Sequence, residues 1–189
     1  MQVHSKNTDG MMSIEDIALA AKQQFGLEYI AITDHTKSLA LAHGLDEKSL
    51  LNQANKISEI NDKLKNHFKN SSGGGGSSSN KKNIVFKILS GAEVNILKDG
   101  TLDISNNVLD KLDVVGAAIH SNFEQPIEVQ TQRQIKAAQN PSVDIIFHPT
   151  GRIINKREGY PLDIGKLINV AKDTNTVLEV NSHYNRLLV

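Results

Sequence analysis

The chain has 189 residues, with 21 Lys plus Arg and 21 Asp plus Glu, so no net charge draws it onto nucleic acid or an anionic membrane. It contains no Cys, which excludes disulfides, thiolate nucleophiles and Cys-type zinc sites and leaves His and carboxylates as the strong metal ligands. No apolar run approaches the length of a membrane span and the first ten residues lack a signal-peptide layout, so we expect a soluble, cytoplasmic protein.

Apolar β-branched runs alternate with amphipathic stretches along the chain. In chain order the pattern predicts strands at 2–4, 29–35, 84–94, 113–120, 143–148 and 176–181, separated by helices at 13–25, 49–64, 108–112, 128–139 and 163–173. Ser13, followed three residues on by Asp16, resembles a capping box at the first helix. This alternation predicts an α/β fold with a mainly parallel sheet and helices outside the strands.

A low-complexity segment, NSSGGGGSSSN at 70–80, interrupts this alternation. It has no side chains that could build a core, so we interpret it as a flexible insertion and not as a site. Neither half of the chain has enough strands to close a barrel alone. We therefore expect a single domain over residues 1–189, with this loop inserted in it.

Metal-competent side chains fall at or just after the carboxyl ends of the predicted strands. They are His4, Asp9, Asp34, His35, Glu93, His120 and His148. A lone His at a strand end is more often a hydrogen-bonded structural residue than a ligand. In a parallel barrel, however, these strand ends converge on one face, so their combination favours a metal site. His43 and His67 lack this placement and are predicted not to be ligands.

Glu93 carries the strongest single indication, because it follows Gly and Ala at the end of an apolar strand. An unpaired carboxylate is costly to bury there, and a metal ion is the simplest remedy. His and carboxylate ligands suit Zn²⁺, Mn²⁺ or Fe²⁺, and closely spaced ions promote phosphoryl transfer by activating water. Arg152, Lys37 and Arg186 could hold a phosphate, although a solvated surface charge explains each equally well.

Several motifs together resemble the polymerase and histidinol phosphatase (PHP) domain. The matching segments are QVHSKNTDG, AITDHTKS, GAEV followed by DGTLD, VVGAAIHSNF, NPSVDIIFHPTGR and LEVNSHYNRL. They cover nearly the whole chain outside the Gly-rich loop, and they are similar in particular to the version at the carboxyl end of bacterial and archaeal family X DNA polymerases.

The resemblance implies a distorted seven-stranded (β/α)7 TIM-like barrel with a site for up to three ions, usually zinc or manganese. It implies phosphate-ester hydrolysis, and in the polymerase-linked branch a 3′-5′ exonuclease with 3′-end processing roles in DNA repair. The positions that match metal ligands are His4, Asp9, His35, Glu93, His120 and His148, with Glu93 as the bridging carboxylate. Asp34 matches a neighbour that orients a ligand.

The sequence departs from the family pattern at both ends. Gln2 stands where many relatives have His, and no last strand ending in Asp-x-His is found. We therefore expect a barrel that lacks its last strand, with marginal stability and weak activity. His183 near this end could replace a ligand, but an exposed loop His is the simpler interpretation.

The sequence thus predicts a metal-dependent phosphoesterase that acts on DNA 3′ ends, with Glu93, Asp34 and Arg152 as catalytic residues. Two alternatives remain open. One is a stand-alone phosphatase for a small ester such as histidinol phosphate, and the other is an incomplete, non-catalytic barrel that serves as an interaction module. The sequence does not indicate the oligomeric state or the native metal.

Overall fold

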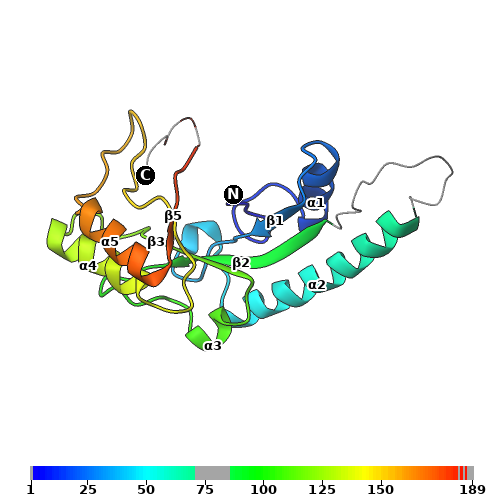
Figure 1. Cartoon of the computed structure of the whole chain (residues 1–189), viewed down its shortest axis with the longest axis horizontal. Coiled ribbons are helices and arrows are strands. Elements are labelled where there is room, and N and C mark those ends of the chain that lie inside the picture. The colour runs from blue at the N-terminus through cyan, green and yellow to red at the C-terminus, as the bar shows by residue number, and fades with distance from the viewer. Residues whose placement is uncertain (1, 71–85, 183, 185, 187–189) are drawn as a thin grey trace.

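The computed structural model describes residues 2–70, 86–182, 184 and 186, with only the backbone for 66–70. Residues 71–80 of the Gly/Ser segment, the His67 side chain and His183 lie outside the described part of the chain. Figure 1 shows the elements in chain order, with β1 and α1 toward one end of the molecule and α4 and α5 toward the other.

A single parallel sheet organises the chain. Its strands are β1 (Tyr29–Ile32), β2 (Lys87–Asn95), β3 (Val114–Ala118), β4 (Ile145–Ile146) and β5 (Val177–Leu178), hydrogen-bonded in that order. Each strand pairs with the next one along the chain, which is the order of a β/α barrel. The α/β class and the parallel sheet predicted from the sequence are confirmed, and the described residues provide five of the strands of a barrel of this type.

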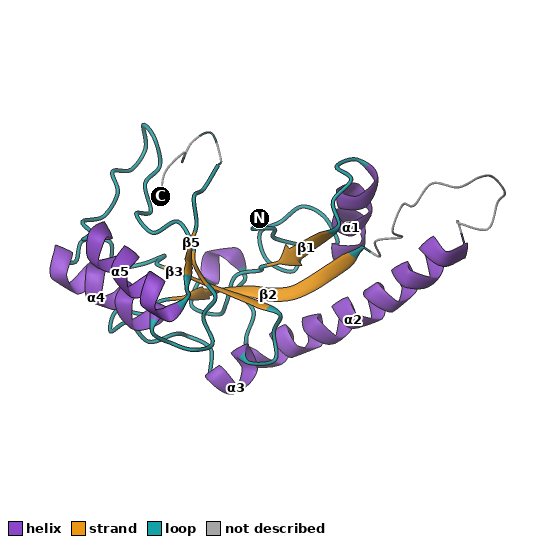
Figure 2. Cartoon of the chain, in the orientation of Figure 1, coloured by secondary structure: helices purple, strands orange, loops and turns teal. Residues whose placement is uncertain are grey.

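Helices occupy the connections between the strands (Figure 2). They are α1 (Ile14–Gln23), α2 (Glu47–Asn70), α3 (Asn106–Leu109), α4 (Ile127–Ala138) and α5 (Ile164–Thr174), with a short 3₁₀ turn, η1 (Ala40–Ala42). Ser13 caps α1 by accepting a hydrogen bond from the Asp16 backbone N–H, as expected. Within the described residues, no helix is long and apolar enough to cross a bilayer.

The predicted strand at 2–4 is wrong, because these residues form no regular strand. They still lie against the end of β1, since the Thr33 N–H donates to the Val3 carbonyl at 2.8 Å and the Val3 N–H donates to the Thr33 hydroxyl at 3.1 Å. One backbone hydrogen bond is too few to form a β-ladder. It is nevertheless enough to bring His4 to the carboxyl end of the sheet.

The nine-residue strand β2 connects two hydrophobic clusters. Its first half packs with α1, β1 and α2, and its second half packs with the elements from α3 to α5. β1 pairs with β2 from Lys87 to Ser90, whereas β3 pairs with β2 from Gly91 to Asn95. The two neighbours are therefore staggered along β2, and the first half of β2 has one edge that β3 does not reach.

Side chains occupy this open edge in place of a strand. The Asn61 amide on α2 both accepts from the Ile88 N–H and donates to the Ile88 carbonyl, each at 2.8 Å. The Asp113 carboxylate accepts from the Ser90 N–H at 2.9 Å and from the Ser90 hydroxyl at 2.8 Å. Because buried backbone groups need partners, these two residues stabilise the strand that carries the site.

We expect Asp113→Asn to lower the free energy of unfolding at pH 6 by about 1 kcal/mol, since the carboxylate is partly screened by solvent. Burial raises the pKa of Asp113, but hydrogen bonds from Ser90 and from Lys87 lower it by more, so the net shift is downward. A lowered carboxyl pKa contributes stability that is present above the unfolded pKa and is lost as the pH falls through the folded pKa. Urea denaturation at pH 6 and pH 2.5 should show the difference from wild type shrinking at the lower pH, and an equal difference at both would contradict it.

Candidate metal centre

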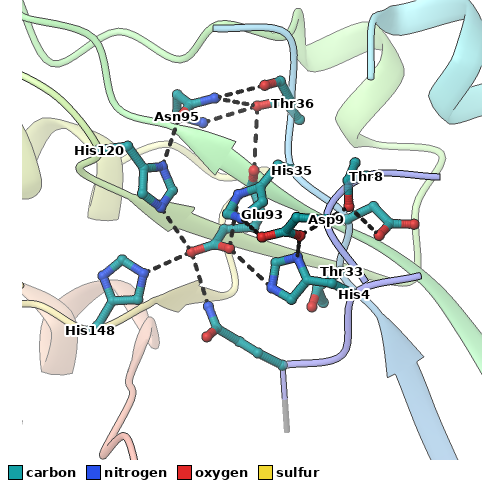
Figure 3. A network of polar contacts seen from close by, with 12 residues as sticks. His4, Thr8, Asp9, Thr33, His35, Thr36, Glu93, Asn95, His120 and His148 are labelled. Carbon is teal, nitrogen blue, oxygen red and sulfur yellow. Dashed lines mark hydrogen bonds and ion pairs between the residues drawn. The ribbon is translucent and has the colours of Figure 1, made fainter. Parts of the chain in front are cut away.

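Glu93 on β2 lies at the centre of four imidazole rings (Figure 3). Its Oε1 is 2.8 Å from His148 Nε2 and 3.2 Å from His120 Nε2. Its Oε2 is 3.2 Å from His35 Nδ1 and 3.4 Å from His4 Nε2. Glu93 is only 1% exposed, so this carboxylate is charged and buried among nitrogen atoms that come from four other segments of the chain.

Asp9 provides a second carboxylate on the other side of two of these rings. Its oxygens lie 3.3 Å from His4 Nδ1 and 3.5 Å from His35 Nε2, and its side chain is half exposed. The two rings are themselves close, with centroids 4.4 Å apart. His4 and His35 are thus placed between Glu93 and Asp9. Each ring faces Glu93 with one nitrogen and Asp9 with the other.

The spacing of these donors fits a shared cation. Charge-assisted N–H···O contacts are about 2.7 to 2.9 Å long, shorter than most of the separations around Glu93 and Asp9. Two ligands that each lie about 2.0 to 2.2 Å from one ion, at tetrahedral or octahedral angles, are roughly 3.0 to 3.5 Å apart. In the part of the chain that the structure describes, two groups have ligand atoms that all lie within 4.8 Å of one another. They are His4 with Asp9 and His35, and His35 with Glu93 and His120.

Three buried imidazole nitrogens strengthen this fit. Among the described residues, Nδ1 of His4, of His35 and of His148 has no hydrogen-bond partner. Buried polar atoms in native proteins are almost always satisfied, so the orphaned nitrogens of His4 and His35, which lie beside carboxylate oxygens, need a proton or an ion to complete them. Nitrogen and oxygen donors in this mixture are typical ligands of zinc and manganese.

The pKa values favour the protonation states that a ligand requires. Burial raises the pKa of Glu93, but its contacts with His120 and His148 lower it by more, so its pKa lies well below the ordinary value. Burial lowers the pKa of His35, and the Glu93 charge opposes this only in part. At neutral pH the carboxylate is therefore ionised and the His35 ring is neutral, as metal binding demands.

Local backbone geometry directs His148 toward Glu93. Its φ is 33°, in the left-handed region that non-glycine residues seldom adopt, and such outliers cluster at functional sites. The His148 N–H donates to Glu179 Oε2 at 2.8 Å, just after β5. Glu179 directly follows β5, and this position at a strand end could have indicated from the sequence that it belongs to the site.

Asp34 is fully buried and does not contact the rings around Glu93. Its carboxylate accepts three hydrogen bonds of 2.6 Å, from the Ser5 N–H, the Ser5 hydroxyl and the Thr8 hydroxyl. These bonds hold the turn that joins His4 to Asp9. The geometry fits a residue that orients ligands and does not fit one that touches a substrate.

The candidate phosphate-binding residues lie in different surroundings. Arg152 is exposed, in the turn after His148, and forms no hydrogen bond or ion pair with another residue that the structure describes. The Lys37 ammonium is 2.6 Å from Glu47, so it is already paired. His43, predicted not to be a ligand, is exposed at the end of η1.

Two polar residues near Glu93 were not identified from the sequence. The Gln2 amide donates to Glu93 Oε1 at 3.1 Å, and Asn95 Oδ1 lies 2.7 Å from His120 Nδ1. The two-residue period of a strand could have indicated Asn95, because it shares a face of β2 with Glu93.

We expect Asp34→Ala to destabilise the protein by about 2 to 4 kcal/mol, because the backbone and hydroxyl groups of the Ser5 turn lose buried acceptors. It should also weaken metal binding through His4 and Asp9. Chemical denaturation and metal titration would measure the two effects. Asp62→Ala, which removes an exposed carboxylate on α2, is the control and should change neither; wild-type stability in Asp34→Ala would contradict the orienting role.

The chain is similar to proteins of two kinds. It is 42% identical over 187 residues to the DNA polymerase/3′-5′ exonuclease PolX of Bacillus subtilis (strain 168), which covers 99% of this chain and 29% of that protein. It is 41% identical over 100 residues to a probable phosphatase of Thermoanaerobacter sp. (strain X514), covering 51% of this chain and 38% of that protein. A probable phosphatase of Caldanaerobacter subterraneus subsp. tengcongensis is 37% identical over 100 residues, covering 51% of this chain and 37% of that protein.

The chain spans about a third of the length of these relatives. No family model matches it. The alignment with PolX nevertheless covers 99% of the chain. These matches confirm the resemblance to the PHP domain of family X DNA polymerases, and the chain is a relative of PolX over nearly its whole length.

Proposed function

We propose that residues 1–189 form one metal-dependent phosphoesterase domain, which acts in the cytoplasm on the 3′ ends of DNA during repair. The observation that supports it most is the convergence of four imidazoles and the Asp9 carboxylate around buried Glu93. If these side chains served only to stabilise the fold, apolar side chains would do so at a lower cost in desolvation free energy. This set of donors does match the needs of a hydrolytic metal site.

The ions would be Zn²⁺ or Mn²⁺, held by residues that the structure brings together. These residues are His4, Asp9, His35, Glu93 and His120, together with His148, which faces the same Glu93 oxygen as His120. When bound, such ions lower the pKa of a bound water and stabilise the charge that develops on a transferred phosphoryl group. The chain itself has no Cys, so no thiolate nucleophile competes with this chemistry.

Glu93 is proposed to bridge two ions because its two oxygens face different partners. Oε1 faces His120 and His148, whereas Oε2 faces His4 and His35. Arg152 is exposed and lies four residues after His148, and its guanidinium would bind the phosphate of a substrate that reaches the site.

DNA 3′ ends are the favoured substrate because the PolX match extends over almost the whole chain. An exonuclease cleaves phosphodiesters and a phosphatase cleaves phosphomonoesters, so the names of both kinds of relative share the hydrolysis of phosphate esters. A phosphatase for small monoesters is the second candidate, favoured by the match to the probable phosphatases over half of the chain. Comparing a recessed DNA 3′ end with p-nitrophenyl phosphate at equal Mn²⁺ would distinguish them.

We expect the protein to bind Zn²⁺ or Mn²⁺ and to be stabilised by it. A ligand at a hundred times its Kd stabilises a fold by about 2.7 kcal/mol, which corresponds to a rise in Tm of roughly 5 to 10 °C for a chain of this size. Elemental analysis and thermal melting with metal or with chelator would measure both. Metal-free protein whose Tm does not respond to added ions would rule out the metal site.

We expect Glu93→Gln to lower the rate of phosphate-ester hydrolysis by at least about a hundredfold, because the variant keeps the volume but removes the bridging charge. Steady-state hydrolysis in Mn²⁺ would measure the loss, with circular dichroism to verify the fold. Glu59→Gln, an exposed position on α2, is the matched control and should keep the wild-type rate. Near wild-type turnover by Glu93→Gln would overturn the bridging role.

A further inference from the structure

The two imidazoles that face Glu93 Oε1 differ in what lies behind them. His120 Nδ1 is 2.7 Å from Asn95 Oδ1, while its Nε2 faces Glu93 at 3.2 Å. His148 Nε2 is 2.8 Å from the same carboxylate oxygen, but its Nδ1 has no hydrogen-bond partner among the described residues. Only one of these two rings therefore has an outer partner that could decide which nitrogen carries the proton.

The orientation of the Asn95 amide follows from its surroundings. Its Nδ2 lies 2.9 Å from Asp103 Oδ2 and 3.1 Å from the Thr36 carbonyl oxygen. A carboxylate and a carbonyl can only accept, so the atom that faces them must be the NH₂ group. The atom turned toward His120 is then the amide oxygen, which is also only an acceptor (Figure 3).

Asp103 and Thr36 hold this amide from behind. The Thr36 hydroxyl donates to Asp103 Oδ1 at 2.7 Å, and the Ser38 N–H donates to Asp103 Oδ2 at 2.8 Å. The Asn95 backbone N–H also donates to Asp103 Oδ1, at 3.1 Å. Among the described residues, the buried Asp103 carboxylate has hydrogen bonds and no ion pair. Because a carboxylate only accepts, it leaves no place for a flipped Asn95, which would turn its own oxygen toward Asp103.

We propose that Asn95 is a positioning residue that keeps a proton on His120 Nδ1 and so presents the Nε2 lone pair toward Glu93 and a bound metal. Asp103 and Thr36 impose the direction of the amide. Without this contact, Glu93 Oε1 would attract a proton to Nε2, the nitrogen that faces the metal centre, as we expect for His148, whose Nε2 lies 2.8 Å from the same oxygen. The functional meaning of this role rests on the proposed metal site, but the position of the proton does not.

The test reads the proton directly in metal-free protein. Two-bond ¹H–¹⁵N spectra, at a pH above the titration range of the rings, distinguish an Nδ1–H from an Nε2–H imidazole. We expect Nδ1–H for His120 and Nε2–H for His148 in the wild-type chain. In Asn95→Leu, which keeps the size of the side chain but removes the acceptor, His120 should change to the Nε2–H form.

Metal titration supplies the second readout. We expect Asn95→Leu to bind Zn²⁺ 10 to 100 times more weakly than wild type, the usual effect of losing a partner behind a ligating His. Asp113→Asn is the matched control, because it removes a carboxylate that holds Ser90 of the same strand but contacts no ring. The control should lose stability while keeping the His120 tautomer and the Zn²⁺ affinity.

The outcomes separate this inference from the proposed function. An Nε2–H form of His120 in wild type would overturn it even if no variant folds, and so would undiminished Zn²⁺ affinity in Asn95→Leu. Nδ1–H in wild type together with no metal binding would support the hydrogen-bond control and refute the metal site. Nδ1–H in wild type, its loss in Asn95→Leu and a weaker Zn²⁺ complex would support both.

Discussion

The burial of one carboxylate constrains most of this structure. Glu93 lies inside a parallel sheet at 1% exposure, where an ionised group without compensation would cost several kcal/mol. The fold meets this cost by bringing imidazole nitrogens from the segments after β1, β3 and β4 and from the N-terminal residues to within about a hydrogen-bond length of it. The strand order makes this possible, because the carboxyl ends of sequential parallel strands meet on one face.

A second layer of hydrogen bonds holds those rings in place. Asp34 holds the turn between His4 and Asp9, Asn95 holds His120, and Glu179 binds the backbone of His148. Each of these three side chains belongs to a different segment of the chain from the ring that it supports. Preorganised geometry of this kind is what distinguishes a working site from a set of suitable residues at loose distances.

The sequence predicted the inner part of this arrangement better than the outer part. Strand periodicity and the placement of His and Asp at strand ends were enough to bring His35, Glu93 and His120 together, because parallel topology alone brings such positions into proximity. The irregular path of residues 2–4 was missed, since one backbone bond to Thr33 replaces a ladder there. The pairing of Asn95 with Asp103 depends on side-chain rotamers across a turn. The left-handed backbone of His148 accompanies a hydrogen bond to Glu179, 31 residues further along the chain, so neither feature can be read from local sequence.

The staggered pairing of β2 also has a consequence for folding. The chain between the paired residues Tyr29 and Lys87 is more than twice as long as that between Gly91 and Val114. Each doubling of a loop adds about 0.6 kcal/mol to the entropic cost of closing it, so the β2–β3 pair forms more readily than the β1–β2 pair. Glu93 lies on β2 beside the point where the two pairings meet. His120 follows β3, which pairs with β2 more readily, and His35 follows β1, which pairs with β2 less readily. On refolding, the cluster can be completed only when the slower half docks, so competence to bind metal should lag behind the recovery of helical structure.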